Sequence, residues 1–156
     1  MAVLAVFAGL PGVGKSTLAG RVAAVLPATV LAVDTVDAAL RRYDVSEPRP
    51  GYAAYGAVLG LAETQLRTGG SVLIDAVNPV RATRQLWTDL AMRLDVPLRV
   101  VEVICADETE HRRRVGDGWE RVLERAREYE PYVGPRLVVD TFLAAQPVPA
   151  VVAYLS

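Results

Sequence analysis

Several features are scarce in this chain of 156 residues, and each scarcity excludes a class of protein. The single cysteine, Cys105, cannot form an internal disulfide, which fits the reducing cytoplasm better than a secreted fold. No apolar run reaches the length of a membrane span, about 18 residues or more. The formal charge of −1 gives no basic excess to hold a nucleic-acid backbone. We therefore expect a cytoplasmic globular protein with one domain, residues 1–156, for which membranes are excluded and nucleic acid is a disfavoured partner.

Lysine is also scarce, because Lys15 is the only lysine among the 17 basic side chains. It stands in the stretch GLPGVGKS, residues 9–16, which matches the phosphate-loop pattern G-x-x-x-x-G-K-[ST] at every fixed position. An apolar run precedes the stretch and a helical pattern follows it, as this motif requires. The residues expected to bind a nucleotide are Gly9, Leu10, Pro11, Gly12, Val13, Gly14, Lys15, Ser16 and Thr17.

The chemistry of this loop explains why a lysine is kept at one position. Glycines let several backbone N–H groups point at one cluster of phosphate oxygens, and the following helix adds its positive end. Lys15 can reach the β- and γ-phosphates as a compact charge, whereas a guanidinium is a planar fork too bulky for the loop. The Ser16 hydroxyl is expected to bind Mg²⁺. The alternative is a glycine turn that only begins a helix.

Short β-rich runs alternate with helical patterns, which predicts an α/β fold with three layers and a five-stranded parallel sheet in the middle. The expected strands are residues 3–8, 29–33, 71–75, 98–105 and 137–139. Apolar residues three or four apart predict helices with buried faces at 18, 22 and 25, at 55, 59, 62 and 66, at 83, 87, 90 and 94, and at 119, 122, 123 and 126. Asp107 and Glu110 together are typical of a capping box at the start of a further helix.

Ligands bind beyond the carboxyl ends of the strands in such sheets, so acidic residues there are candidate site residues. Asp75 ends the run SVLID and is expected to hold Mg²⁺ or its water. Asp34 ends the run TVLAVD and is a candidate base for the hydroxyl of an acceptor. Asp37 follows three residues later on the same helical face and is a candidate substrate contact. Helix capping is the alternative explanation for all three aspartates.

The segment DAVNPVRATRQLW, residues 75–87, holds two further candidates for binding the substrate, Asn78 and Arg84. An asparagine followed by Pro79 is typical of a helix start, so a capping role alone explains Asn78. Arg84 either binds a phosphate or lies on the solvated surface.

Three consecutive arginines, residues 112–114, follow the fourth predicted strand. Neighbouring helical residues point about 100° apart, so at most one or two of these arginines can face a bound phosphate. His111 has no cysteine or histidine companion for binding a metal, and we expect it on the surface.

The phosphate loop, Asp34, the pattern that joins Asp75, Asn78 and Arg84, and the arginine-rich helix occur in an order that resembles the P-loop kinases of the adenylate-kinase-like group. The resemblance covers essentially the whole chain. It is closest to small bacterial kinase-like ATP-binding proteins, which are related to the kinase domain of phage-type polynucleotide kinases, zeta toxins and chloramphenicol phosphotransferase.

This resemblance implies a sheet of order 2-3-1-4-5 and a short lid at about 107–118. It also implies that Asp34 activates the acceptor and that Arg112 or Arg114 closes on the transferring phosphate. The chain departs from the family pattern at Asp37, where relatives commonly carry an arginine nearby, and at residues 116–118, where their lid is longer.

Together these residues predict an ATP- and Mg²⁺-dependent phosphotransferase that moves the γ-phosphate of ATP to a hydroxyl of a small molecule. The acceptor pocket is expected between the Asp34 helix and residues 43–55, where Tyr52 and Tyr55 can stack on a ring. Packing of its helix explains Tyr55 equally well. Two alternatives stay open: a polynucleotide 5′-hydroxyl kinase, and a nucleotide-binding switch that hydrolyses ATP slowly or not at all.

Overall fold

The computed structural model describes residues 1–45 and 51–156, and its centre is a parallel sheet of five strands in the order β2-β3-β1-β4-β5. The order and direction of the strands confirm the predicted fold. Strand β3 has the predicted bounds, strand β2 is shifted by one residue toward the N-terminus, and β1, β4 and β5 each differ from the prediction by one residue at one end. The strands are β1 (Leu4–Ala8), β2 (Ala28–Ala32), β3 (Ser71–Asp75), β4 (Leu98–Ile104) and β5 (Leu137–Asp140).

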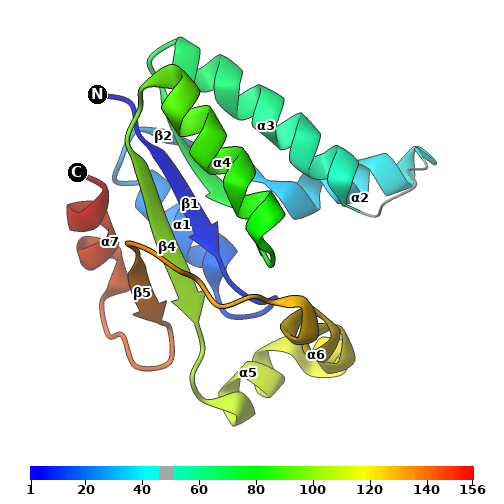
Figure 1. The fold of residues 1–156 in the computed structure, drawn as a ribbon. Coiled ribbons are helices and arrows are strands. Elements are labelled where there is room, and N and C mark those ends of the chain that lie inside the picture. Colours follow the sequence, from blue (N-terminus) through cyan, green and yellow to red (C-terminus); the bar gives the residue numbers. More distant parts are fainter. Residues whose placement is uncertain (46–50) are drawn as a thin grey trace.

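Helices cover both faces of the sheet (Figure 1). One face is packed by α1 (Lys15–Ala23) and α7 (Pro147–Leu155), and the other by α3 (Tyr52–Arg67) and α4 (Arg81–Leu94), with α2 (Val33–Arg42) against α3. The core divides in two because successive strand residues point to opposite faces. Leu4 and Val6 of β1 therefore pack with α3 and α4, whereas Ala5 and Phe7 pack with α1 and α7.

A third group of helices lies beyond the carboxyl ends of the strands (Figure 1). It consists of α5 (Glu108–Val115), a short 3-10 helix (Gly116–Gly118) and α6 (Trp119–Glu128). The Asp107 carboxylate caps α5 by accepting the Glu110 N–H at 2.7 Å, as predicted. No helix in residues 1–45 and 51–156 combines the length and the apolarity that a membrane span needs.

Two details of the first half differ from the prediction. Val25 was expected on the buried face of α1, but that helix ends at Ala23, and 61% of Val25 is exposed. Strand β2 passes into α2 without a loop, so Asp34 is the second residue of the helix rather than the end of the strand. The helix cap is Ala32, which has no side-chain oxygen to offer, so capping does not explain Asp34.

Candidate active site

The phosphate loop joins β1 to α1 at the carboxyl edge of the sheet. Gly9 and Gly12 have φ values of 144° and 79°, in the region that side chains disfavour. A Cβ on Gly9 would collide with the Val103 carbonyl oxygen, and a Cβ on Gly12 would collide with a methyl group of Val115. Conformation and close neighbours therefore both require glycine at these two positions of the loop.

Lys15 is the first residue of α1 and is buried, with 7% of its surface exposed. Its ammonium group donates to the carbonyl oxygen of Leu10 within the loop at 3.2 Å. Burial lowers the pKa of Lys15 below its ordinary value, and the negative charges of Asp75 and Asp34 oppose this shift. The ammonium group is thus held inside the loop, within electrostatic reach of both carboxylates.

Ser16 and Asp75 meet at the carboxyl edge of the sheet. The Ser16 hydroxyl donates to the Asp75 carboxylate at 2.6 Å, and Asp75 is buried at the end of β3. A hydroxyl and a carboxylate are oxygen ligands that suit Mg²⁺, which takes its remaining ligands from water and nucleotide phosphates. No cluster of three or more histidine, cysteine or acidic residues that could hold a metal occurs in the described part of the chain, so the pair fits Mg²⁺ better than a fully protein-bound metal.

Asp34 lies in the first turn of α2 and lines a cavity of about 490 Å³. The walls of the cavity come from α2, α3, α4, α6 and the segment that follows β3. Asp37 lines the same cavity and forms an ion pair with Arg41 at 2.9 Å. The predicted base and a predicted substrate contact therefore face one space.

Tyr52 and Tyr55 of α3 also line this cavity. The Tyr55 hydroxyl accepts the backbone N–H of Asn78 at 3.1 Å, and its ring lies 6.3 Å from the ring of Trp87. Burial is the main cause that raises the pKa of Tyr55 to about 12, so the phenol stays protonated at neutral pH. Tyr55 thus combines helix packing with a place at the cavity. Part of the predicted 43–55 segment, residues 46–50, lies outside the described residues.

Asn78 is not the predicted helix cap, because α4 begins at Arg81 and its cap is Val80. It has a φ of 50°, a left-handed conformation that asparagine tolerates better than most residues, and it is fully buried. Its side-chain oxygen accepts the indole N–H of Trp87 at 2.7 Å, and its amide donates to the Ala76 carbonyl at 3.3 Å. Asn78 therefore supports the wall of the cavity and presents no side-chain group to it.

Arg84 binds the backbone rather than an open anion site. Its guanidinium donates to the carbonyl oxygens of Asn78 at 2.8 Å, Pro131 at 3.1 Å and Glu130 at 2.5 Å. It also lies 3.6 Å from the ring centre of Tyr132. Arg84 thus ties the chain after α6 to the start of α4, and neither of its predicted roles, phosphate binding or solvated surface, matches these contacts.

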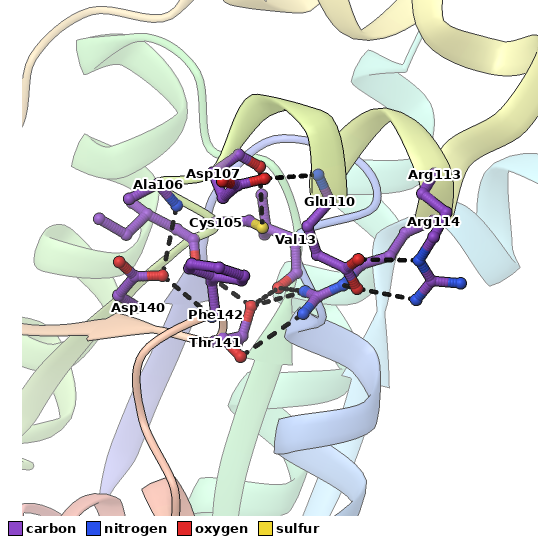
Figure 2. A network of polar contacts seen from close by, with 11 residues as sticks. Val13, Cys105, Ala106, Asp107, Glu110, Arg113, Arg114, Asp140, Thr141 and Phe142 are labelled. Carbon is purple, nitrogen blue, oxygen red and sulfur yellow. Dashed lines mark hydrogen bonds and ion pairs between the residues drawn. The ribbon is translucent and has the colours of Figure 1, made fainter.

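Arg114 reaches from α5 to the phosphate loop, as Figure 2 shows. Its guanidinium donates to the Thr141 hydroxyl at 2.7 Å and to the Val13 carbonyl at 3.4 Å, and it pairs with Glu110 at 3.0 Å. The Thr141 hydroxyl donates in turn to the Val13 carbonyl at 2.6 Å. The lid, the loop after β5 and the phosphate loop therefore share one polar network.

The other two arginines of the lid have exposed side chains. Arg113 pairs with Glu110 at 2.8 Å, while Arg112 pairs with Glu108 at 3.6 Å and lies 5.1 Å from the ring centre of Trp119. The structure therefore separates Arg114, which touches the loop, from its neighbours.

His111 was expected on the surface, and this prediction was wrong. It is buried, its Nε2 lies 2.7 Å from the carbonyl oxygen of Pro11, and its ring meets the Trp119 ring edge-on at 5.1 Å. Because a carbonyl oxygen only accepts, Nε2 carries the hydrogen. His111 packs α5 onto the phosphate loop, and Val115, four residues later, also contacts the loop, at Gly12. This spacing of four was the sign in the sequence that His111 is buried.

Three further residues at the cavity were not identified from the sequence. Arg121 and Arg125 lie four apart on α6, a spacing that places them on one face, and both line the cavity. Gly56 lines it from α3. In the sequence, the place of Gly56 at the cavity was indicated only by the occurrence of a glycine within a helical pattern.

Known proteins resemble this chain in sequence and in fold. The sequence profile of the AAA domain family AAA_33 matches residues 4–146. An adenylyl-sulfate kinase of Synechococcus sp. (strain JA-3-3Ab) is 36% identical over 106 residues, which are 62% of this chain and 60% of that protein. The match thus spans less than two thirds of this relative.

Solved structures share the fold. The APS kinase of Mycobacterium tuberculosis, in complex with AMPPNP and APS, has 22% identity and a TM-score of 0.71 over 99% of this chain and 97% of that chain. A sugar kinase from Janibacter sp. HTCC2649 has 14% identity and a TM-score of 0.77 over 99% of this chain and 95% of that chain. At these identities the likeness concerns the fold alone.

Proposed function

Because this chain belongs to the AAA domain family AAA_33, we propose that it is an ATP- and Mg²⁺-dependent phosphotransferase acting on a hydroxyl of a small molecule. The 36% identical relative is named as a kinase of adenylyl sulfate, and the structural neighbours are named as kinases of APS and of a sugar. These names support a kinase of small molecules. Because they differ in acceptor, the acceptor has to be inferred from the cavity of this chain.

The observation that carries the proposal is that the buried Lys15 of the loop lies within electrostatic reach of two carboxylates. Asp75, with Ser16, belongs to the metal-binding side of the site, and Asp34 belongs to the cavity. Both act electrostatically on the Lys15 ammonium. A nucleotide in the loop and a molecule in the cavity would therefore meet near Lys15, as transfer between them requires.

Each residue has a task in the proposed reaction. The loop and Lys15 would bind the phosphates, and Ser16 and Asp75 would hold Mg²⁺, which would offset the negative charge of the phosphates. A bond forms between the acceptor oxygen and the γ-phosphorus while the bond to the departing ADP oxygen breaks. Asp34 takes the proton that the acceptor hydroxyl loses and releases it to solvent. Arg114, next to the loop, is the arginine placed to move toward the transferring group.

The test is ADP release measured with ATP and Mg²⁺ in three conditions: a panel of small alcohols, oligonucleotides with a 5′-hydroxyl, and no acceptor. The proposal predicts release that depends on a small alcohol and is lost in Lys15→Met. Release that depends on the oligonucleotides would identify a polynucleotide kinase. Slow release that no acceptor accelerates would identify a switch, and either result would contradict the proposal.

A further inference from the structure

We propose that the acceptor is an alcohol with a flat apolar ring, and that Gly56 makes the space for this ring in the cavity beside Asp34. The inference rests on the proposed function, since it names the class of molecule that receives the phosphate.

The walls of the cavity are mainly apolar. Helix α3 contributes Tyr52, Tyr55, Gly56 and Leu59, whose spacing places them on one stripe of the helix. Val80 and Leu86, in and just before α4, line the same cavity. Against these apolar side chains a molecule with many hydroxyls would lose hydration, whereas a ring would bury apolar surface. The charged side chains of the lining come from α2 and α6 rather than from this stripe of α3.

Gly56 is the unusual member of the stripe, because it stands inside a helix, where glycine is unfavourable. A Cβ at this position would meet no atom within 4 Å, so no neighbour in the described part of the protein requires glycine there. The missing side chain instead leaves a bare stretch of helix backbone facing the cavity. A ring can lie flat against such a surface.

Gly60, one turn later in α3, provides a matched control. A Cβ there would also meet no atom within 4 Å, but Gly60 does not line the cavity. A larger residue at either position therefore has the same effect on the stability of the helix, but only a larger residue at position 56 fills the cavity.

Polar groups near one side of the cavity can bind a single hydroxyl of the acceptor. The Tyr55 oxygen is fixed by the Asn78 N–H at 3.1 Å, and the charge of Asp34 acts on this phenol. An acceptor hydroxyl between them would accept from the Tyr55 O–H and give its own proton to Asp34. The charge of Arg125 on α6 also acts on this phenol, and Arg125 pairs with Glu128 at 3.6 Å.

The test measures binding with two fluorinated probes, 2-(4-fluorophenyl)ethanol and 2-deoxy-2-fluoroglucose, by fluorine NMR line broadening in the presence of ADP and Mg²⁺. Wild type and Gly60→Leu should bind the aryl alcohol, and Gly56→Leu should bind it at least tenfold more weakly. All three proteins should bind the sugar more weakly than wild type binds the aryl alcohol. Absence of aryl-alcohol binding by wild type, equal binding by Gly56→Leu, or preference for the sugar would overturn the proposal.

Folding of the variants is checked by thermal unfolding. Leucine favours helices more than glycine, so both variants should unfold at or above the wild-type temperature. If Gly56→Leu unfolds at a lower temperature than wild type, Gly56→Ala is measured in its place. Gly56→Ala should weaken aryl-alcohol binding, but by less than the loss expected for Gly56→Leu.

Acceptor-dependent ADP release from the same proteins separates this inference from the proposed function. Release driven by polyhydroxyl acceptors and unchanged by Gly56→Leu would overturn the inference and keep the kinase. Ring binding that Gly56→Leu abolishes, with no ADP release from any acceptor, would overturn the kinase instead.

Discussion

The Ser16 hydroxyl lies 2.6 Å from a carboxylate oxygen of Asp75, although the two residues are 59 positions apart. The sheet brings them together, because β1 and β3 pair in parallel with Phe7 opposite Asp75, and α1 starts just beyond β1. Both oxygens belong to the proposed Mg²⁺ site, so their separation defines one side of that site.

We predict that Ser16→Ala and Asp75→Asn weaken Mg²⁺-dependent turnover more than Mg²⁺-free nucleotide binding, since both residues are assigned to the metal. The defect should shrink as the Mg²⁺ concentration is raised. Titration of turnover against Mg²⁺ measures this shift, and Mg²⁺-free nucleotide binding by each variant serves as its control. Titration curves that match wild type in both variants would remove the pair from the metal site.

We predict that Lys15→Arg, like Lys15→Met, loses turnover while the fold is kept. The Lys15 ammonium lies inside the loop against the Leu10 carbonyl, and a planar guanidinium cannot take the same place as a compact charge. Turnover and thermal unfolding of both variants test this. An arginine variant with wild-type turnover would show that the loop needs only a positive charge.

The sequence was sufficient for the fold and for the phosphate loop, because both depend on local patterns. The apolar run at residues 3–8 predicts the strand that the structure has at Leu4–Ala8, and the spacing of glycines around Lys15 marks the loop without knowledge of its neighbours. The resemblance to adenylate-kinase-like kinases supplied the order of the strands.

The sequence misled where the partner of a side chain is distant or the backbone is unusual. Asn78 was predicted as a substrate contact, with a helix cap as the alternative because Pro79 follows it, but a left-handed backbone turns its amide toward Trp87. Arg84 and His111 bind carbonyl oxygens of chain segments that no local pattern connects to them.

We predict that Asn78→Ala destabilises the protein by about 1–3 kcal/mol, because it leaves the buried indole N–H of Trp87 without its acceptor. Gln85→Ala, on the exposed side of α4, should stay within about 0.5 kcal/mol of wild type. Chemical denaturation of both variants measures the difference. If the two variants have equal stability, the bond between Asn78 and Trp87 contributes little.

We predict that Arg114→Ala lowers the rate of phosphoryl transfer by about 10²-fold with a smaller effect on ATP affinity, as expected for a group that stabilises charge in the transition state. Arg113→Ala is the matched control, since Arg113 shares the Glu110 partner, whereas the bonds to Val13 and Thr141 are made by Arg114 (Figure 2). Arg113→Ala should leave the rate of transfer and the ATP affinity nearly unchanged. Equal losses of ATP affinity in both variants would indicate a general electrostatic effect.

Single-turnover phosphoryl transfer by Asp34→Asn, measured beside Asp37→Asn, tests directly whether Asp34 accepts the proton of an acceptor hydroxyl. Both aspartates line the cavity from α2, but Asp37 is paired with Arg41. We predict that Asp34→Asn slows transfer by about 10²- to 10⁴-fold with ATP binding nearly unchanged, and that Asp37→Asn has a much smaller effect on the rate. A stably folded Asp34→Asn protein that transfers phosphate at the wild-type rate would contradict the account.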